Sequence, residues 1–295
     1  MLNARNPALE APLLADPYDR EAWIVYGDWL QQQGDPRGEY IALRAAWLAN
    51  PSDREARDRL DRCAGHHGDY FRGPLKGELG WSFVDSTGLP MWPTDAITSP
   101  EARFVTRLSI TPQFEGRVDE IIAQDGPHLP VTVRRLFIGG VDLTTLAPLA
   151  ATLDRLHELS FRTAIRTDEL SSFEFPALRT LDFEYDENND HFVPRALLGN
   201  ALPSLVTLRL ALWGIDGALV STIAHAPYAK QLTSLWLFFL TDAAAKVLLD
   251  NISRFPALTE LMVDDSRMSA EMLRRLDSIP GFGQARAGGY DYRDY

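Results

Sequence analysis

The side chains with the most reactive chemistry in this sequence lie close together, at Cys63, His66 and His67. A thiol beside two imidazoles could act as a nucleophile with its base, or could bind a metal ion. The spacing fits no recognised zinc motif, and no local motif supplies the orienting group that a cysteine nucleophile needs. The sequence therefore favours a small buried thiol on a helix. The alternative, a cysteine-dependent ligase or hydrolase that uses Cys63, requires a thiol of lowered pKa in a cleft beside one of the histidines.

The remaining histidines form no known catalytic pattern. His128, His157, His191 and His225 are scattered, no HExxH sequence occurs, and no glycine-rich phosphate loop follows a strand. We therefore predict no catalytic residue, no metal ligand and no cofactor.

An acidic group made of Asp182, Glu184, Asp186 and Glu187 is the second candidate site. It could be a patch that binds a basic partner or a cation, or it could be ordinary solvated surface. A metal site needs several oxygen ligands that converge, and neighbouring positions alone do not establish convergence. Both interpretations stay open.

The elements that would position these residues follow a repeated apolar pattern. Its core reads apolar-x-x-apolar-x-apolar, and it occurs seven times at intervals of 22 to 28 residues. Such a pattern is typical of leucine-rich repeats, whose units bury their apolar faces only by stacking on one another. We therefore predict an α/β fold: a leucine-rich-repeat solenoid with a parallel concave sheet. The seven copies are Val105–Ile110, Val133–Ile138, Leu156–Phe161, Leu178–Phe183, Leu205–Leu210, Leu232–Leu237 and Leu258–Val263.

The segments between the copies are weakly amphipathic and predict helices on the convex side. They are Val118–Ala123, Leu146–Leu153, Pro194–Leu198, Gly217–Ala226, Asp242–Asn251 and Ala270–Leu276.

Alternation along the predicted strands identifies the candidate binding face. Successive side chains of a strand face opposite sides, so the residues between the framework positions should line the concave face. Most are polar, but several large apolar residues interrupt them, and exposed clustered aromatics suggest a binding anchor. Alternatively, Trp236 and Phe238 pack under a loop, the tail or a neighbouring repeat, and a shift of one residue in register would reverse the assignment. The candidate protein-binding residues are Phe137, Arg162, Asp182, Glu184, Arg209, Trp213, Trp236, Phe238 and Met262.

Residues 1–76 differ from the rest and predict a small all-α domain. Asp19 is the predicted N-cap of a helix from Arg20 to about Gln33, with Trp23, Tyr26, Gly27 and Leu30 on one face. The turn Gly34-Asp35-Pro36 precedes the next helix, which Asn50-Pro51-Ser52 ends. That helix carries Ile41, Leu43, Trp47 and Leu48. A fourth, highly charged helix is expected over about Asp53–His66, with Leu60 and Cys63 facing inward, and the first of the four segments ends at Asp16-Pro17.

The remaining boundaries follow from composition. Residues 77–103 predict a linker and capping unit, within which Trp81–Val84 alternates like a short strand. The solenoid is expected over 104–280, and the Gly- and Tyr-rich residues 281–295 predict a flexible tail.

The block Ala22–Glu39 carries a family resemblance. It reads AWIVYGDWLQQQGDPRGE, and it resembles the repeat-companion domain of bacterial proteins, whose hallmark is close to Tyr-Ala-Asp-Trp-Leu-x-x-x-Gly-Asp-Pro-Arg-Gly-Glu. The resemblance covers roughly residues 1–75 and implies a module that precedes leucine-rich repeats, without implying an activity. Gly27 stands where alanine is usual, which indicates close helix packing.

The charged residues of this block have two interpretations. Asp28, Asp35, Arg37 and Glu39 could form a buried ion-pair and capping network, which we favour, or a docking surface. The repeats also depart from the common leucine-rich form, because the usual Asn or Cys after each strand is absent. The residues at that position are Gln113, Val141, Ala164, Asp186, Trp213, Leu240 and Ser266.

Composition narrows the classes of function. The net charge is −12, which argues against non-specific nucleic-acid binding. Residues 77–280 hold 17 basic and 27 acidic side chains, net −10, so the acidity belongs to the repeats and favours a basic partner. With a single cysteine, no good signal peptide and no long apolar run, we expect a cytoplasmic protein with no membrane segment.

The predicted function is therefore protein binding. We expect a non-enzymatic scaffold or recognition adaptor that binds a partner protein through the concave face, in a bacterial signalling or defence setting. Besides the Cys63 enzyme, the alternative is an acidic inhibitor that grips a partner enzyme. The sequence does not identify the partner or the oligomeric state.

Overall fold

The chain forms two compact units. One consists of Met1–Thr111 and Gln124–Arg135, and the other of Pro112–Ala123 and Leu136–Tyr295. The computed structural model describes residues 4–73, 75, 77–78, 86–89, 98–100, 102–111, 118–139, 144–162, 173–184, 202–211, 215–263 and 267–279.

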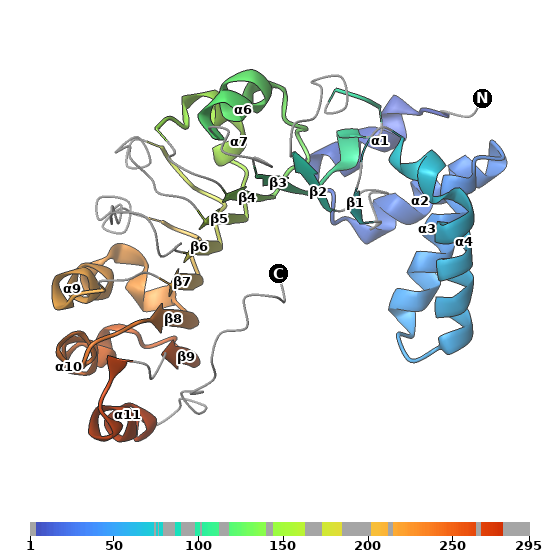
Figure 1. The fold of residues 1–295 in the computed structure, drawn as a ribbon. Helices are drawn as coiled ribbons and strands as arrows, with labels where there is room; N and C mark the ends of the chain where they lie inside the picture. Colours follow the sequence, from blue (N-terminus) through green and yellow to red (C-terminus); the bar gives the residue numbers. More distant parts are fainter. Residues whose placement is uncertain are drawn as a thin grey trace. The chain divides into compact units, whose positions relative to one another are not determined.

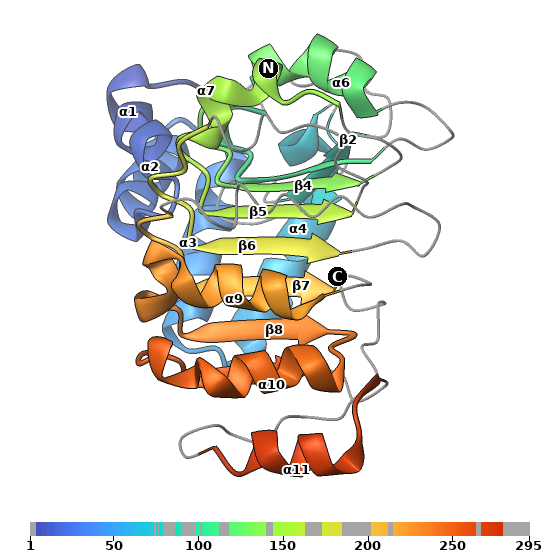
Figure 2. The same ribbon diagram turned by 90° about the vertical axis from the view of Figure 1, so that its left-hand side faces the viewer.

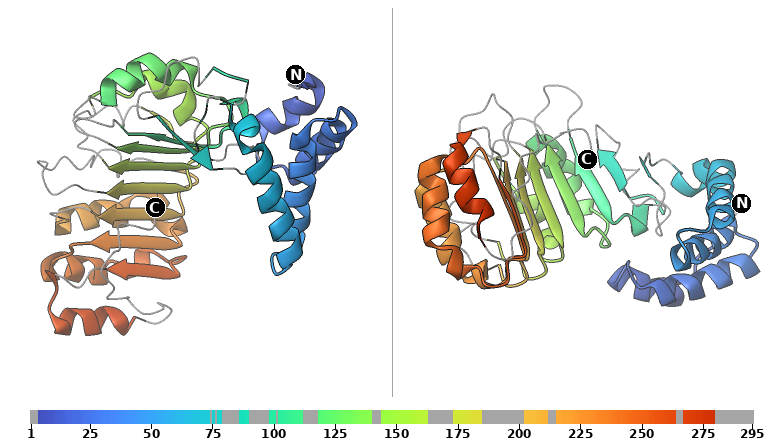
Figure 3. Two further views of the ribbon diagram at one scale, coloured as in Figure 1. Left: turned by 45° about the vertical axis from the view of Figure 1, so that its right-hand side comes forward. Right: turned by 90° about the horizontal axis from the view of Figure 1, so that it is seen from below.

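The first unit contains four helices in its N-terminal part: α1 (Pro7–Ala15), α2 (Arg20–Gln32), α3 (Pro36–Ala49) and α4 (Arg54–Arg72) (Figures 1 and 3). Each begins at a side-chain cap, which satisfies amide groups that have no partner within the helix. Asp19 accepts a hydrogen bond from the amide of Ala22, and Asp53 accepts one from Ala56. The predicted cap at Asp19 and the helix start at Pro36 are confirmed.

Helix α4 is longer than predicted. The sequence suggested an end near His66, but the helix continues to Arg72 because Phe71, in its last turn, is buried against Tyr40. Helix α1 is the segment that the sequence predicted to end at Asp16-Pro17: it ends at Ala15 with Asp16 as its C-cap, and it contains Pro12.

Helices α2 and α3 cross at two glycines. A Cβ on Gly38 would lie 2.6 Å from the carbonyl oxygen of Gly27 and 2.5 Å from the amide nitrogen of Gln31. A Cβ on Gly27 would lie 2.7 Å from the Cγ2 of Ile41. Both positions therefore require glycine for the backbones to approach this closely, which confirms the close packing expected at Gly27.

The core of this unit reaches beyond the four helices. The rings of Trp23 and Phe104 lie 5.0 Å apart edge-on, and both are buried. Phe104 belongs to the short helix η1 (Ala102–Phe104), which is followed by strand β3 (Arg107–Ile110). Strand β1 (Gly77–Glu78) pairs antiparallel with β2 (Ser86–Leu89), and β2 pairs in parallel with β3. The helical module is thus completed by residues from the first predicted repeat.

The second unit is an α/β structure whose strands follow chain order (Figure 2). The pairs from β5 to β9 are all parallel. Helices α9 and α10 cover one face of the strands in Figure 2. The strands are β4 (Arg135–Gly139), β5 (Glu158–Arg162), β6 (Thr180–Glu184), β7 (Thr207–Ala211), β8 (Ser234–Phe238) and β9 (Glu260–Val263). Its α-helices are α7 (Ala150–Leu153), α9 (Gly217–His225), α10 (Asp242–Asp250) and α11 (Ala270–Asp277), and its short helices are η3 (Ala147–Leu149), η5 (Pro227–Gln231) and η6 (Ile252–Arg254). Helix α6 (Val118–Asp125) begins in this unit and ends in the first unit, to which the short helix η2 (Gly126–His128) belongs.

Burial along the strands alternates as the sequence predicted. In β7, for example, Leu208 and Leu210 are buried whereas Thr207 and Arg209 are partly exposed. Each of the seven apolar copies supplies one strand, so the predicted register and the α/β class are confirmed. The predicted helical segments agree with α6, η3 with α7, α9, α10 and α11 to within two residues.

Backbone hydrogen bonds join successive strands at their amino ends. The carbonyl of Val206 accepts from the amides of Thr233 and Ser234, and the carbonyl of Thr233 accepts from those of Thr259 and Glu260. The hydroxyls of Thr233 and Thr259 donate to the same two carbonyls. Threonine thus supplies part of the hydrogen bonding between repeats.

Some predictions lie outside the described residues. These are the strand-like segment Trp81–Val84, the helix Pro194–Leu198, the tail 281–295 and every position of the expected Asn ladder except Leu240, which is fully buried. Within the described part of the chain, no helix is long and apolar enough to cross a membrane.

Candidate functional site

The candidate site lies on the sheet of the second unit, on the face turned away from α9 and α10, which we call the front face. Strand register places one residue from each of five strands side by side. This central row consists of Ser160, Asp182, Arg209, Trp236 and Met262, and all five side chains are partly exposed. Because the framework residues on either side are buried, the alternation of each strand turns this row toward solvent.

Arg209 and Trp236 form the centre of the row. They are cross-strand partners on β7 and β8, and the guanidinium carbon lies 4.2 Å from the centroid of the indole ring. At this distance the cation interacts favourably with the face of the ring. The Nε of Arg209 and the Nε1 of Trp236 are both buried and have no hydrogen-bond partner. The pair is therefore held by stacking and packing rather than by hydrogen bonds.

Arg209 makes no ion pair with any residue that the structure describes. Its interaction with Trp236 is its only polar or aromatic contact among them. The side chain stays partly exposed while Nε is buried, so its outer nitrogens are the donors that solvent can reach. The row thus presents a positioned guanidinium next to the apolar surface of Trp236 and Met262.

Phe238 corrects the sequence prediction. It was expected to be exposed, but only 4% of it is accessible. Its ring packs edge-on against Trp236 with the centroids 6.2 Å apart, and its register partner Ala211 is also buried. Phe238 therefore flanks Trp236 on the same face of β8 as a buried side chain.

Ser234 is a second front-face position that is buried rather than exposed. Its hydroxyl donates to the carboxylate of Glu260 on the next strand at 2.6 Å. Ser234 and Glu260 are register partners at the amino ends of β8 and β9, so this hydrogen bond lies beside Trp236 on the front face.

The other candidate residues are distributed as follows. Phe137 on β4 and Met262 on β9 are partly exposed, and Arg162 at the end of β5 is exposed. Met262 belongs to the central row as the register partner of Trp236. Trp213 and the side chain of Glu184 lie outside the described residues.

The acidic group is only partly described. Asp182 belongs to the central row, directly beside Arg209, whereas Asp186 and Glu187 lie outside the described residues. Among the residues that are described, no three His, Cys, Asp or Glu side chains come together in a way that could hold a metal ion.

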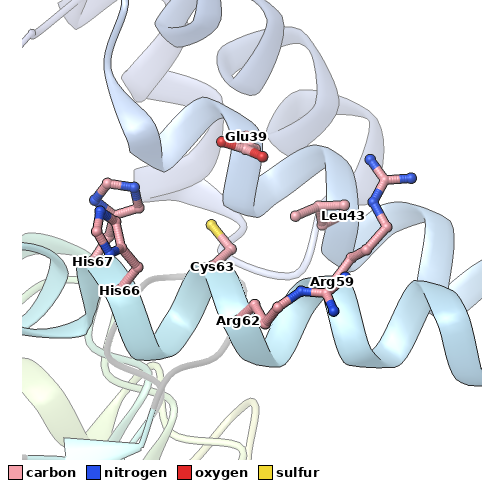
Figure 4. A pocket seen from close by; sticks show the side chains of 7 residues that line it. All are labelled: Glu39, Leu43, Arg59, Arg62, Cys63, His66 and His67. Carbon is pink, nitrogen blue, oxygen red and sulfur yellow. The ribbon is translucent and has the colours of Figure 1, made fainter.

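Cys63 lines an open pocket in the helical unit (Figure 4). The pocket has a volume of about 330 Å³, and its lining comes from α3 and α4. In Figure 4 the sulfur points toward α3 and Glu39, with His66 and His67 one turn away along α4. The lining residues are Glu39, Leu43, Arg59, Arg62, Cys63, His66 and His67.

The pKa of Cys63 is raised, whereas a cysteine nucleophile needs a lowered pKa. Burial, and then the negative charge of Glu39, raise the pKa of the thiol to about 11. At neutral pH the thiol is protonated, although the thiolate is the reactive form. The two histidine rings lie 4.4 Å apart and nearly perpendicular to each other. The structure thus brings the thiol and imidazoles together but does not activate the thiol.

The GDPRGE turn is a buried network. Asp35 accepts hydrogen bonds from the Nε and Nη2 of Arg37 at 2.9 and 2.6 Å, and also from the hydroxyl of Tyr70 at 3.2 Å. Burial alone would lower the pKa of Arg37, but the hydrogen bond and charge of Asp35 outweigh it and raise the pKa. Asp35 and Arg37 are both buried, which confirms the structural interpretation for this pair, whereas Asp28 and Glu39 are exposed.

A second buried network was missed by sequence reasoning. Glu10, only 1% exposed, accepts hydrogen bonds from the hydroxyl of Tyr26 at 3.0 Å and from Arg103 at 3.1 Å. Burial, and then the charge of Glu10, raise the pKa of Tyr26 to about 12. Because Glu10 and Arg103 are far apart in sequence, no local pattern signals their pairing.

Comparisons with known proteins add little to this geometry. No protein-family model matches the chain, and no curated protein matches it. Among solved structures, a crystal structure of a protein from Bacteroides fragilis, a structural-genomics target, is similar over 79% of this chain and 84% of its own length. The sequence identity is 15% and the TM-score is 0.47, so the likeness carries no argument about fold or function.

Proposed function

We propose that the chain is a leucine-rich-repeat solenoid preceded by a repeat-companion module, and that it is a non-enzymatic scaffold or recognition adaptor. The partner is a protein that binds to the front face of the second unit. Seven apolar copies at intervals of 22 to 28 residues, each with a parallel-sheet strand, support the repeat class.

The stacked pair Arg209 and Trp236 is the observation that carries the proposal. Trp and Arg are enriched among the residues that dominate binding energy, and such residues lie near the centre of an interface. Here the two types occur as cross-strand partners at the centre of a row of partly exposed side chains. The ring of Phe238 packs edge-on against the indole, and this contact reduces the side-chain entropy that Trp236 loses on binding.

The Cys63 pocket supports this choice indirectly. A protonated thiol with a pKa of about 11 offers no nucleophile at neutral pH. The front face is therefore the better-supported of the two candidate sites.

The test is a quantitative capture experiment from extract of the native cell. The full-length protein is compared with Trp236→Ala and with Lys246→Ala, a matched control at an exposed position of α10. We expect one or more captured proteins to fall about tenfold with Trp236→Ala, which corresponds to about 1.4 kcal/mol, and to remain with Lys246→Ala.

Unfolding curves establish that both variants are folded. Captured proteins that do not depend on Trp236, or an absence of captured protein, would contradict the proposal for the front face.

A further inference from the structure

We propose that Arg209 is a receptor for a single carboxylate of the partner protein, presented on an extended segment beside an apolar or aromatic side chain. This inference rests on the proposed function and names the chemistry that the front face recognises.

The first argument is the free guanidinium. Arg209 has no ion pair or hydrogen bond among the described residues. Its outer nitrogens form a planar fork that matches the two oxygens of a carboxylate. Its guanidinium carbon lies 4.2 Å from the centroid of the indole ring of Trp236. The guanidinium is therefore held against the ring before any ligand arrives, and a pre-oriented donor loses less conformational entropy on binding.

The second argument is the apolar surface next to it. Trp236 and Met262 are register partners on adjacent strands, and both are partly exposed. Neighbouring strands lie about 4.8 Å apart. A ligand carboxylate on Arg209 would therefore place an adjoining side chain over Trp236 or Met262, where an aromatic or aliphatic group would bury apolar area.

The third argument limits the charge of the ligand. Residues 77–280 carry a net charge of −10, and Asp182 is the neighbour of Arg209 on the other side. A segment with several carboxylates would be repelled. We therefore expect one acidic residue at a fixed position, in a segment without net negative charge.

The experiment is selection from a displayed library of random peptides on the full-length protein. Three proteins are compared: the natural chain, Arg209→Gln, and Arg44→Gln as the matched control. Arg44 also lies over a tryptophan, Trp47, at 5.7 Å, but it belongs to α3 in the first unit. We expect Asp or Glu to be enriched about tenfold at one position beside an apolar residue, and this preference to vanish only with Arg209→Gln.

A second measurement does not depend on a variant protein. Titration calorimetry compares a selected peptide with its twin in which Asp or Glu is replaced by Asn or Gln. We expect the twin to bind the natural chain about tenfold more weakly, or about 1.4 kcal/mol.

Each other outcome overturns the inference in a distinguishable way. Selected peptides without an acidic position, or an acidic preference retained by Arg209→Gln, would reject the carboxylate but leave the binding face intact. If the selection yields no peptide, the inference that Arg209 receives a carboxylate is rejected. The proposed function is then still decided by the capture experiment with Trp236→Ala. A consensus that reproduces Tyr290-Asp291-Tyr292 would assign the face to a segment of this chain instead of a partner.

Discussion

Arg103 donates a hydrogen bond to the carboxylate of Glu10 at 3.1 Å, although 93 residues separate them in the sequence. Glu10 is 1% exposed and the side chain of Arg103 is 12% exposed. Thr132 donates to the backbone carbonyl of Arg103, and Arg134 donates to the carbonyl of Ala15. The helical module is thus joined to residues 102–111 and 124–135 by part-buried polar contacts within a single compact unit.

Replacing Glu10 by alanine should therefore destabilise this unit strongly. The change leaves the guanidinium of Arg103 and the hydroxyl of Tyr26 without their buried acceptor, and breaking a buried ion pair costs about 3 to 5 kcal/mol. Urea unfolding followed by circular dichroism measures the loss. Asp28→Asn, at an exposed position of α2, is the control and should change stability by less than about 0.5 kcal/mol. A similar small effect of Glu10→Ala would show that the pair does not hold the unit together.

Gly38→Ala should destabilise the crossing of α2 and α3 even though alanine favours helix. The new Cβ would meet backbone atoms of Gly27 and Gln31 at 2.6 and 2.5 Å, which cannot move aside as a flexible side chain could. Overpacking should outweigh the gain in helix propensity and lower the free energy of unfolding by about 1 to 2 kcal/mol.

Gly65→Ala is the matched control for that experiment. Gly65 lies in α4, and nothing is within 4 Å of the position of its Cβ. This variant should be more stable by about 0.5 to 1 kcal/mol. Equal effects of the two substitutions in denaturant melts would contradict the close crossing.

Asp35→Asn tests the buried turn. Asparagine can still cap α3, but it leaves the buried guanidinium of Arg37 without a counter-charge, so we expect a loss of about 3 to 5 kcal/mol. Asp53→Ala removes a cap of α4 at an exposed position and should cost only about 1 kcal/mol.

A double variant separates charge burial from capping. Arg37→Met in the Asp35→Asn background removes the uncompensated cation, and part of the lost stability should return. A double variant that is less stable than Asp35→Asn by the full cost of Arg37→Met alone would argue against coupling between the two side chains.

Cys63 should resist alkylation at neutral pH. Its pKa in the folded protein is raised to about 11 by burial and by Glu39, from an ordinary value of 9.0. Since Cys63 is the single cysteine, the rate of iodoacetamide modification against pH reports this thiol alone. We expect the folded protein to reach its half-maximal rate near pH 11 and the urea-unfolded protein to reach it near pH 9.

The same shift has a consequence for stability. The unfolded chain releases the thiol proton at lower pH than the folded chain, so the contribution of Cys63 is fully present below about pH 9 and is lost as pH rises toward 11. Cys63→Ser should lessen the fall of stability over this interval. A folded protein that alkylates rapidly at pH 7 would revive the cysteine-dependent alternative.

The sequence alone determined the features that depend on local chemistry. Seven apolar copies set the strands and their inward faces, because a strand alternates its side chains with a period of two. Asp19, Asp35 and Asp53 marked helix starts, because a short acceptor satisfies amides that a helix leaves free. The members of the central row, Ser160, Asp182, Arg209, Trp236 and Met262, follow from the same alternation.

Only the tertiary structure decided which distant groups meet. The pairing of Glu10 with Arg103 and the stacking of Arg209 on Trp236 each depend on strands or helices that the fold brings together. Phe238 is likewise buried by packing at the end of β8, and the alternation of side chains along the strand does not predict this burial. Helix α4 continues to Arg72, through Gly68, because Phe71 gains a buried site. Local sequence patterns determine the alternation of strand side chains and the N-caps of helices. The burial of a side chain and its pairing with a distant residue depend on the assembled chain.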